Sequence, residues 1–120
     1  MVSIEEHDPD MLRAIEAARS TIGEFFDAFE HPKTGQSGFL IKARFDDGKS
    51  VEHIWLADLD FSSNPAKGRV ANETNFPGLE YLQMTSFGPE QITDWMFYQD
   101  GELIGAYTTK LLLQRQQQIN

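Results

Sequence analysis

Side chains that could do chemistry are sparse in this sequence, and the first to stand out are Glu52 and His53, within residues 51–55 (VEHIW). A histidine beside a carboxylate is an ingredient of acid–base catalysis or of a ligand-binding site. The segment is rich in β-branched and aromatic residues, however, and neighbouring side chains of a strand point to opposite faces. Glu52 therefore cannot orient His53 directly, so any partner of His53 must come from another strand.

Asp94, in the segment TDWMF, is the carboxylate best suited to be that partner. Strand alternation places it on one face with Ile92 and Met96, so we expect it to point toward apolar surroundings. A buried carboxylate needs hydrogen-bond donors, because an unpaired buried charge is expensive. The donors that the sequence offers are His53, Lys42, Asn72 and backbone N–H groups.

Two interpretations of this group remain open. A structural hydrogen-bonded network on a sheet face is favoured over catalysis, because no nucleophile is identifiable beside the Asp and His. Trp55 and Trp95 are interpreted as core residues or groove walls, and their N–H groups require partners.

Metal and cofactor chemistry has no support in the motifs. The three histidines, His7, His31 and His53, lie in different kinds of segment, and none has the i, i+4 spacing of helical zinc ligands. The chain has no cysteine, which excludes disulfides, thiolate zinc sites and a cysteine nucleophile. Phosphate loops and nucleophile elbows are also missing. We therefore predict no metal, no cofactor and no catalytic residue.

Composition restricts the partners. With 120 residues, 40% of them hydrophobic, the chain can form a single domain with one core. A net charge of −9 argues against nucleic acid and favours a protein partner with a basic patch. No apolar run approaches 18 residues and the N-terminus lacks a secretory pattern, so we expect no membrane span and a cytoplasmic location.

The elements that must position these residues begin with a helix over about 9–30. Asp8 and Pro9 are typical of a helix start. Gly23 is a weak point, and residues 31–38 form a loop. One helical face is apolar and carries Met11, Ile15, Ala18, Ile22, Phe25 and Phe29.

The remainder, about 38–107, is rich in strands. Residues 39–45 and 50–61 predict a hairpin that turns at Asp47-Gly48, and residues 92–108 predict another that turns at Asp100-Gly101. Shorter strands are expected at 68–73 and 81–87. Thr108 or Thr109 would cap a C-terminal helix whose glutamine-rich end frays, over about 108–120. The predicted fold is α+β: an N-terminal amphipathic helix packed on a curved antiparallel sheet or partly open barrel of five to six strands, with a short C-terminal helix.

The order of short motifs resembles the bacterial Domain of Unknown Function family 2314, the YegJ-like proteins. The likeness covers about residues 38–113 and departs before Asp94, where PGLEYLQMTSFGPEQ replaces the family's Gly-Asp-type turn. The resemblance implies no activity, but it groups Glu52, His53, Trp55, Asn72 and Asp94 as one constellation. The matching positions are Lys42, Glu52, His53, Trp55, Gly68, Asn72, Asp94, Trp95, Gly105 and Thr108.

We therefore expect a bacterial, non-catalytic binding or accessory module, monomeric or homodimeric, that recognises a protein partner through the face around His53 and Asp94. An immunity-like inhibitor of a toxin is one concrete version, suggested by small size and acidity. The alternative is a small-molecule enzyme that uses His53 and Asp94 as an acid–base pair. The expected binding or structural constellation comprises Lys42, Glu52, His53, Trp55, Asn72, Asp94, Trp95 and Thr108.

Overall fold

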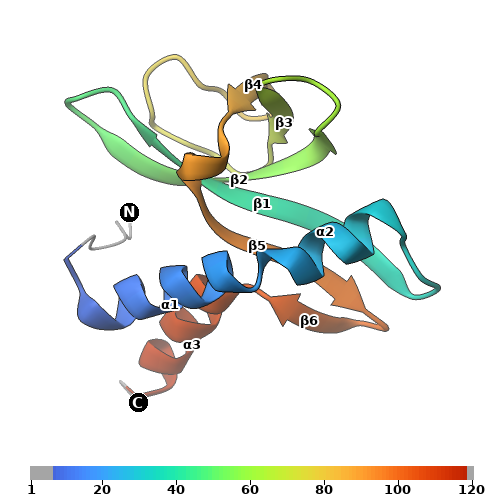
Figure 1. Ribbon diagram of the computed structural model, residues 1–120. Helices are drawn as coiled ribbons and strands as arrows, with labels where there is room; N and C mark the ends of the chain where they lie inside the picture. The colour runs from blue at the N-terminus through green and yellow to red at the C-terminus, as the bar shows by residue number, and fades with distance from the viewer. Residues whose placement is uncertain (1–6, 119–120) are drawn as a thin grey trace.

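The structure is a computed structural model, and it describes residues 7–118. Within those residues, three α-helices accompany one open sheet of six antiparallel strands in the order β4-β3-β2-β1-β5-β6 (Figure 1). The predicted α+β fold is confirmed, and the sheet is not closed into a barrel. The elements are α1 (Pro9–Ser20), α2 (Ile22–Glu30), β1 (Gln36–Asp46), β2 (Val51–Asp60), β3 (Ala66–Val70), β4 (Met84–Phe87), the 3₁₀ turn η1 (Pro89–Gln91), β5 (Ile92–Gln99), β6 (Glu102–Gly105) and α3 (Tyr107–Gln118).

Both predicted hairpins are present. β1 and β2 are joined by a turn in which Asp47 Oδ1 accepts hydrogen bonds from the backbone N–H groups of Lys49 and Ser50, at 2.9 and 2.7 Å. β5 and β6 turn at Asp100 and Gly101, which both have positive φ. Short polar residues and glycine tolerate this conformation, so the turn chemistry was readable in the sequence.

The predicted helix over 9–30 is in fact two helices that break at Thr21. Asp8 caps α1 as expected, accepting the N–H of Asp10 at 2.9 Å. In a continuous helix the carbonyl of Ala18 would accept the N–H of residue 22. Here that carbonyl accepts the indole N–H of Trp95 at 2.9 Å. A tertiary hydrogen bond thus accompanies the break, which lies two residues before the expected weak point.

Three other boundaries differ from the predictions. β3 and β4 are shorter than the expected 68–73 and 81–87 segments, and Leu82 has a φ of +74°, which interrupts the extended backbone before Met84. The last helix begins at Tyr107, so neither predicted threonine is its cap. Its glutamine-rich end is helical to Gln118, and the rest of the predicted frayed tail lies outside the described residues.

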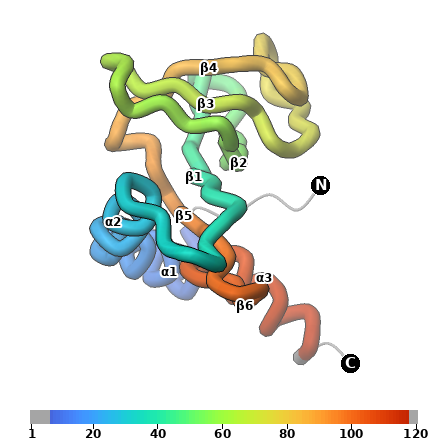
Figure 2. The backbone as a smooth tube through the Cα atoms, turned by 90° about the vertical axis from the view of Figure 1, so that its right-hand side faces the viewer, coloured from blue at the N-terminus to red at the C-terminus, as the bar shows by residue number. Residues whose placement is uncertain are grey.

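The two N-terminal helices cover one face of the sheet, as the view in Figure 2 shows. Phe25 is fully buried, and its ring centroid lies 6.2 Å from that of Trp95. Ile41, Ile54 and other inward residues of the central strands complete this core. The expected apolar stripe of the helices is therefore a core face, and the opposite face of β1, β2 and β5 carries the candidate site.

Candidate functional site

Three of the singled-out residues lie side by side across the central strands. Lys42 on β1 is the register partner of Trp55 on β2 and of Asp94 on β5. Cross-strand partners project from the same face of a sheet, so their side chains meet on the face opposite to the helical core. This row depends on the pairing of β1 with β5, two strands about fifty residues apart in sequence.

Asp94 acts as the N-terminal cap of α3, although it lies on β5. Its Oδ1 accepts the N–H groups of Trp95 and Tyr107 at 2.8 and 3.1 Å. Its Oδ2 accepts the N–H and the hydroxyl of Thr108 at 2.9 and 2.5 Å. The residue before the helix is Ala106, with a φ of +51° and no side chain that could cap. A remote carboxylate therefore accepts two of the free N–H groups of the first turn and lies at the positive end of the helix.

Lys42 joins the same network from the side of β1. Its ammonium donates to Thr108 Oγ1 at 2.8 Å and lies 4.9 Å from the centre of the Trp55 ring. Only 5% of the residue is exposed, and Asp94 and Thr108 are fully buried. Burial lowers the pKa of Lys42 because water no longer solvates the cation, and the nearby Asp94 charge partly offsets this. The hydroxyl of Thr108 thus links the cation to the carboxylate.

His53 does not form the predicted pair with Asp94. Its Nδ1 lies 3.1 Å from the hydroxyl of Thr93, while both oxygens of Asp94 are occupied by donors from other residues. The register of β1 and β5 shifts between Lys42 and the next residue, and this irregularity places Ile92 opposite Ala43 in the core. The prediction that Ile92 shares the face of Asp94 is therefore wrong, because simple alternation ignores a bulge.

Asn72 and Trp95 have structural contacts. Asn72 Oδ1 accepts the N–H of Trp55 at 2.8 Å, which extends the pairing of β2 and β3 beyond the last residue of β3. Trp95 is 1% exposed and its indole N–H reaches α1, so it is a core residue rather than a groove wall. The sequence had left Trp95 open as a core residue or a groove wall, and had offered Asn72 as a donor to Asp94.

Two glycines among the positions that match the family, Gly68 and Gly105, allow close packing. Gly105 has a φ of +78°, and a Cβ there would lie 2.5 Å from the carbonyl oxygen of Trp95. A Cβ on Gly68 would lie 2.9 Å from Cβ of Leu56. Gly105 leads the chain from β6 into α3 at the point where Asp94 caps the helix, and this explains the spacing of glycine and threonine at 105 and 108.

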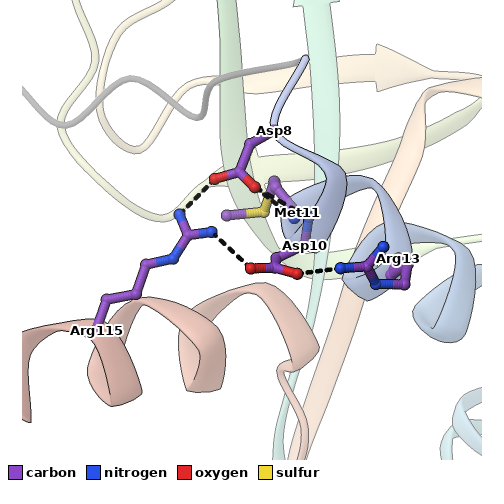
Figure 3. A network of polar contacts seen from close by, with 5 residues as sticks. All are labelled: Asp8, Asp10, Met11, Arg13 and Arg115. Atoms are coloured by element: carbon purple, nitrogen blue, oxygen red, sulfur yellow. Dashed lines mark hydrogen bonds and ion pairs between the residues drawn. The ribbon is translucent and has the colours of Figure 1, made fainter. Parts of the chain in front are cut away.

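A second polar network joins the start of α1 to α3, and no motif had indicated it. Arg115 on α3 donates to Asp8 at 2.5 Å and to Asp10 at 3.5 Å, and Asp10 also contacts Arg13 (Figure 3). The hydrogen bond from Arg115 lowers the pKa of Asp8, with further contributions from the backbone N–H groups that Asp8 caps. The start of α1 and the C-terminal part of α3 are thus joined by charged contacts at the surface.

Glu52 is separated from His53, as strand alternation predicted. It lies at the hairpin end of the core-side face as the register partner of Phe45. Phe76, from the segment 71–83, packs there with its ring centroid 6.0 Å from that of Phe45. Glu52 lines an open cleft of about 360 Å³ that sequence reasoning missed, because its walls come from segments brought together only by folding. The other lining residues are Glu73, Thr74, Asn75, Leu79, Glu80 and Tyr81.

The described part of the chain contains neither a candidate metal site nor a membrane-spanning helix. Between residues 7 and 118, no three His, Asp or Glu side chains are arranged to hold a metal ion. No helix in that span is long and apolar enough to cross a membrane.

Comparison with known proteins places the chain in a bacterial family. Residues 8–118 match the family described as "Uncharacterized protein conserved in bacteria (DUF2314)". The chain is 31% identical over 104 residues to "Uncharacterized protein YegJ" of Escherichia coli K12, covering 86% of this chain and 67% of that protein. It is 27% identical over 118 residues to "Putative ankyrin repeat protein NMB1133/NMB1171" of Neisseria meningitidis serogroup B, covering 91% of this chain and 47% of that protein.

No solved structure gives a significant match. The family match extends over nearly all of the chain, and includes the capped helix start at Asp94 and Thr108 as well as the glycines that allow it. The chain therefore belongs to the bacterial DUF2314 family.

Proposed function

We propose that this chain is a non-catalytic binding module that recognises a basic segment of a protein partner through the acidic cleft. The observation that carries the proposal is the convergence of Glu52, Glu73 and Glu80 with Tyr81 on one open cleft. None of the described residues that line it is a lysine or arginine. Like charges that share a cleft repel one another, so a cationic side chain that enters relieves repulsion as well as forming ion pairs.

Tyr81 supports a cation as the occupant. Its side chain is 53% exposed, which leaves much of its surface available to a ligand. A lysine or arginine above an aromatic ring gains about 0.5–1 kcal/mol at an exposed site. The net charge of −9 would in addition steer a basic partner toward the protein.

The state of the other charged residues favours binding over catalysis. Asp94, Lys42 and Thr108 hold one another and the start of α3, and they are buried. Acid–base chemistry needs a titratable group within reach of a substrate, and Asp94 is enclosed by its four donors. The constellation is thus better suited to stabilising the fold than to contacting a partner. We therefore propose the cleft of Glu52, rather than the face of His53 and Asp94, as the contact surface.

The Neisseria relative gives independent support. It is named a putative ankyrin repeat protein, and the similarity to this chain spans 47% of it. Ankyrin repeats stack into solenoids with extended concave binding surfaces. An accessory binding role agrees with the presence of a similar segment in such a chain, and an immunity-like inhibitor that covers a basic site would be one form of it.

The test compares the intact protein with Glu73→Gln/Glu80→Gln and with a control, Glu16→Gln/Glu102→Gln, that removes the same charge from exposed positions elsewhere. Each tagged protein is incubated with native bacterial lysate at physiological salt, and bound proteins are identified by mass spectrometry. We expect one partner with a basic segment, retained by the control and lost with the cleft variant. With purified partner, Kd should rise about tenfold, since two exposed ion pairs contribute up to about 1 kcal/mol each.

Three results would contradict the proposal. A partner bound equally by all three proteins would place the contact outside the cleft. Equal loss in both variants would show a dependence on net charge alone. A retained partner without any basic segment would refute the stated chemistry.

A further inference from the structure

The free edge of β4 offers backbone groups to another strand. β4 is the terminal strand of the sheet. The N–H of Val70 donates to the carbonyl of Gln83 at 2.8 Å. Hydrogen-bonded pairs alternate along an antiparallel ladder, so the next residue of β4 that bonds to β3 is Thr85. Met84 and Ser86 lie at the alternate positions and direct their N–H and C=O groups away from β3. The Ser86 carbonyl lies 3.5 Å from the Thr85 hydroxyl, which is the limit of a hydrogen bond.

This short edge lacks two of the features that commonly prevent strand addition, charged residues and proline. Residues 83–87 (QMTSF) contain no charged residue and no proline. The opposite edge strand, β6, begins with the charged Glu102 and leads directly into α3. Leu82 and Met84 are 53% and 40% exposed, so apolar surface accompanies the free backbone groups. The edge therefore has the chemistry of a strand acceptor.

The acidic cleft and the edge strand are joined by a short stretch of chain. Glu80 and Tyr81 line the cleft and precede β4 by only a few residues. A strand added antiparallel to β4 runs from Phe87 toward Met84, so its C-terminal end points toward the cleft. Lysine or arginine at that end would come beside the glutamates.

We propose that β4 receives an extended segment of the partner as an additional antiparallel strand, with the basic end of that segment in the acidic cleft. The inference rests on the proposed function and specifies how the partner is held. A second copy of this chain is a poorer occupant, because it carries the same net charge of −9 and would be repelled by the acidic cleft. The strand supplies affinity through backbone hydrogen bonds, and the cleft supplies selectivity for charge.

The test uses fluorescein-labelled eight-residue peptides in which Val and Thr alternate and two lysines end the sequence, with a reversed peptide as the control for direction. Affinity is measured by fluorescence anisotropy with the intact protein. We expect the forward peptide to bind more tightly than the reversed one. N-methylation of two alternate amides should raise Kd about tenfold or more, because each methyl group removes a backbone hydrogen-bond donor.

Two matched variants locate the contact on the protein. Ser86→Pro removes the outward N–H, whereas Ser86→Ala keeps it, so only the proline variant should weaken binding. Amide exchange followed by NMR gives a readout that needs no variant. The amides of Met84 and Ser86 should exchange rapidly in the free protein and slow at least about tenfold with saturating peptide, whereas Thr85 should be protected in both states.

The outcomes separate this inference from the proposed function. In one outcome, peptide binding depends on the cleft glutamates alone: Glu73→Gln/Glu80→Gln weakens it, and N-methylation and Ser86→Pro leave it unchanged. That result would overturn strand addition and leave the acidic cleft as the contact. Peptide binding that none of these changes affects would overturn both strand addition and the proposed cleft contact. The same holds if no binding occurs at peptide concentrations up to about 1 mM. Protection of Met84 and Ser86 in a concentration-dependent dimer without peptide would make a second copy the occupant and refute the inference.

Discussion

The network around Asp94 yields the sharpest prediction for stability. Asp94→Asn preserves the shape of the side chain but replaces one oxygen with an NH₂ group. The oxygen that remains can keep the two N–H donors now on Oδ1, at 2.8 and 3.1 Å. The amide donor would then face the N–H and hydroxyl of Thr108, which now donate to Oδ2. Lys42 would also lose its neighbouring counter-charge.

The size of the effect follows from these contacts. Two hydrogen bonds to a charged group are lost, each with a contribution of about 1.5–3 kcal/mol, and rotation of the Thr108 hydroxyl recovers part of this. Removal of one member of a buried charge pair typically costs about 3–5 kcal/mol. We therefore expect Asp94→Asn to lower the free energy of unfolding by about 3–5 kcal/mol. Since small domains have about 5–15 kcal/mol in total, the variant should fold with reduced stability.

Lys42→Met is the companion variant for a double-mutant cycle. It retains most of the apolar stem but removes the cation that now lies over Trp55 and bonds to Thr108. In the Asp94→Asn background this cation no longer has a carboxylate beside it, so its removal should be less harmful or even favourable. Urea unfolding monitored by tryptophan fluorescence and far-UV circular dichroism measures all four proteins. We expect a coupling of about 1 kcal/mol or more between the two sites.

Two results would refute this reasoning. The first is a loss below about 1 kcal/mol for Asp94→Asn, which would mean that the carboxylate does not stabilise the start of α3. The second is additivity within about 0.5 kcal/mol, which would mean that Lys42 and Asp94 act independently.

Three further predictions concern local packing and charge. Gly105→Ala should lower the free energy of unfolding by about 3 kcal/mol or more, since it combines a positive φ with a Cβ 2.5 Å from a carbonyl oxygen. Gly78 also has a positive φ but open space around it, so Gly78→Ala should cost only about 1 kcal/mol. Thermal unfolding of both variants checks this. The pKa of Lys42 is lowered from 10.5 in the folded state, so the unfolded chain binds that proton more tightly. As pH rises toward 10.5, the free energy of unfolding of the native protein should therefore increase relative to that of Lys42→Met. A smaller increase with pH in the native protein than in the variant would contradict this. The pKa of Asp8 is lowered from 3.8 in the folded state, so its contribution to stability is present above pH 3.8 and is lost as pH falls through the folded-state pKa. Arg115→Gln should therefore reduce the dependence of stability on pH in that acid range. An acid-unfolding transition that the substitution leaves unchanged would count against the contact.

Local patterns in the sequence account for much of the fold. The 3.6-residue repeat of apolar residues from Met11 to Phe29 follows from the geometry of a helix with one buried face, and it holds across the break at Thr21. Asp47-Gly48 and Asp100-Gly101 predicted both hairpins, because these residues tolerate the backbone conformations that tight turns require. Alternation in the second strand correctly separated Ile54 and Leu56 from Trp55, since the burial of a strand follows its period of two.

Contacts between distant segments decided the rest. The break at Thr21 accompanies the indole of Trp95, and the bulge beside Thr93 moves Ile92 into the core. Neither leaves a local signal, because the residues involved are compatible with several backbone geometries. The acidic cleft likewise depends on folding, which brings the segment 71–83 beside Glu52.

Asp94 illustrates the division between the two kinds of information. The sequence by itself determined that this carboxylate lies in a strand and needs donors, because a buried charge must be compensated wherever it is. Only the tertiary structure decided that the donors are the first turn of α3, with Lys42 beside them, rather than His53. The physical reason is that local propensity and periodicity act over a few residues, whereas the partner of a buried polar group is chosen by strand register and packing across the whole chain.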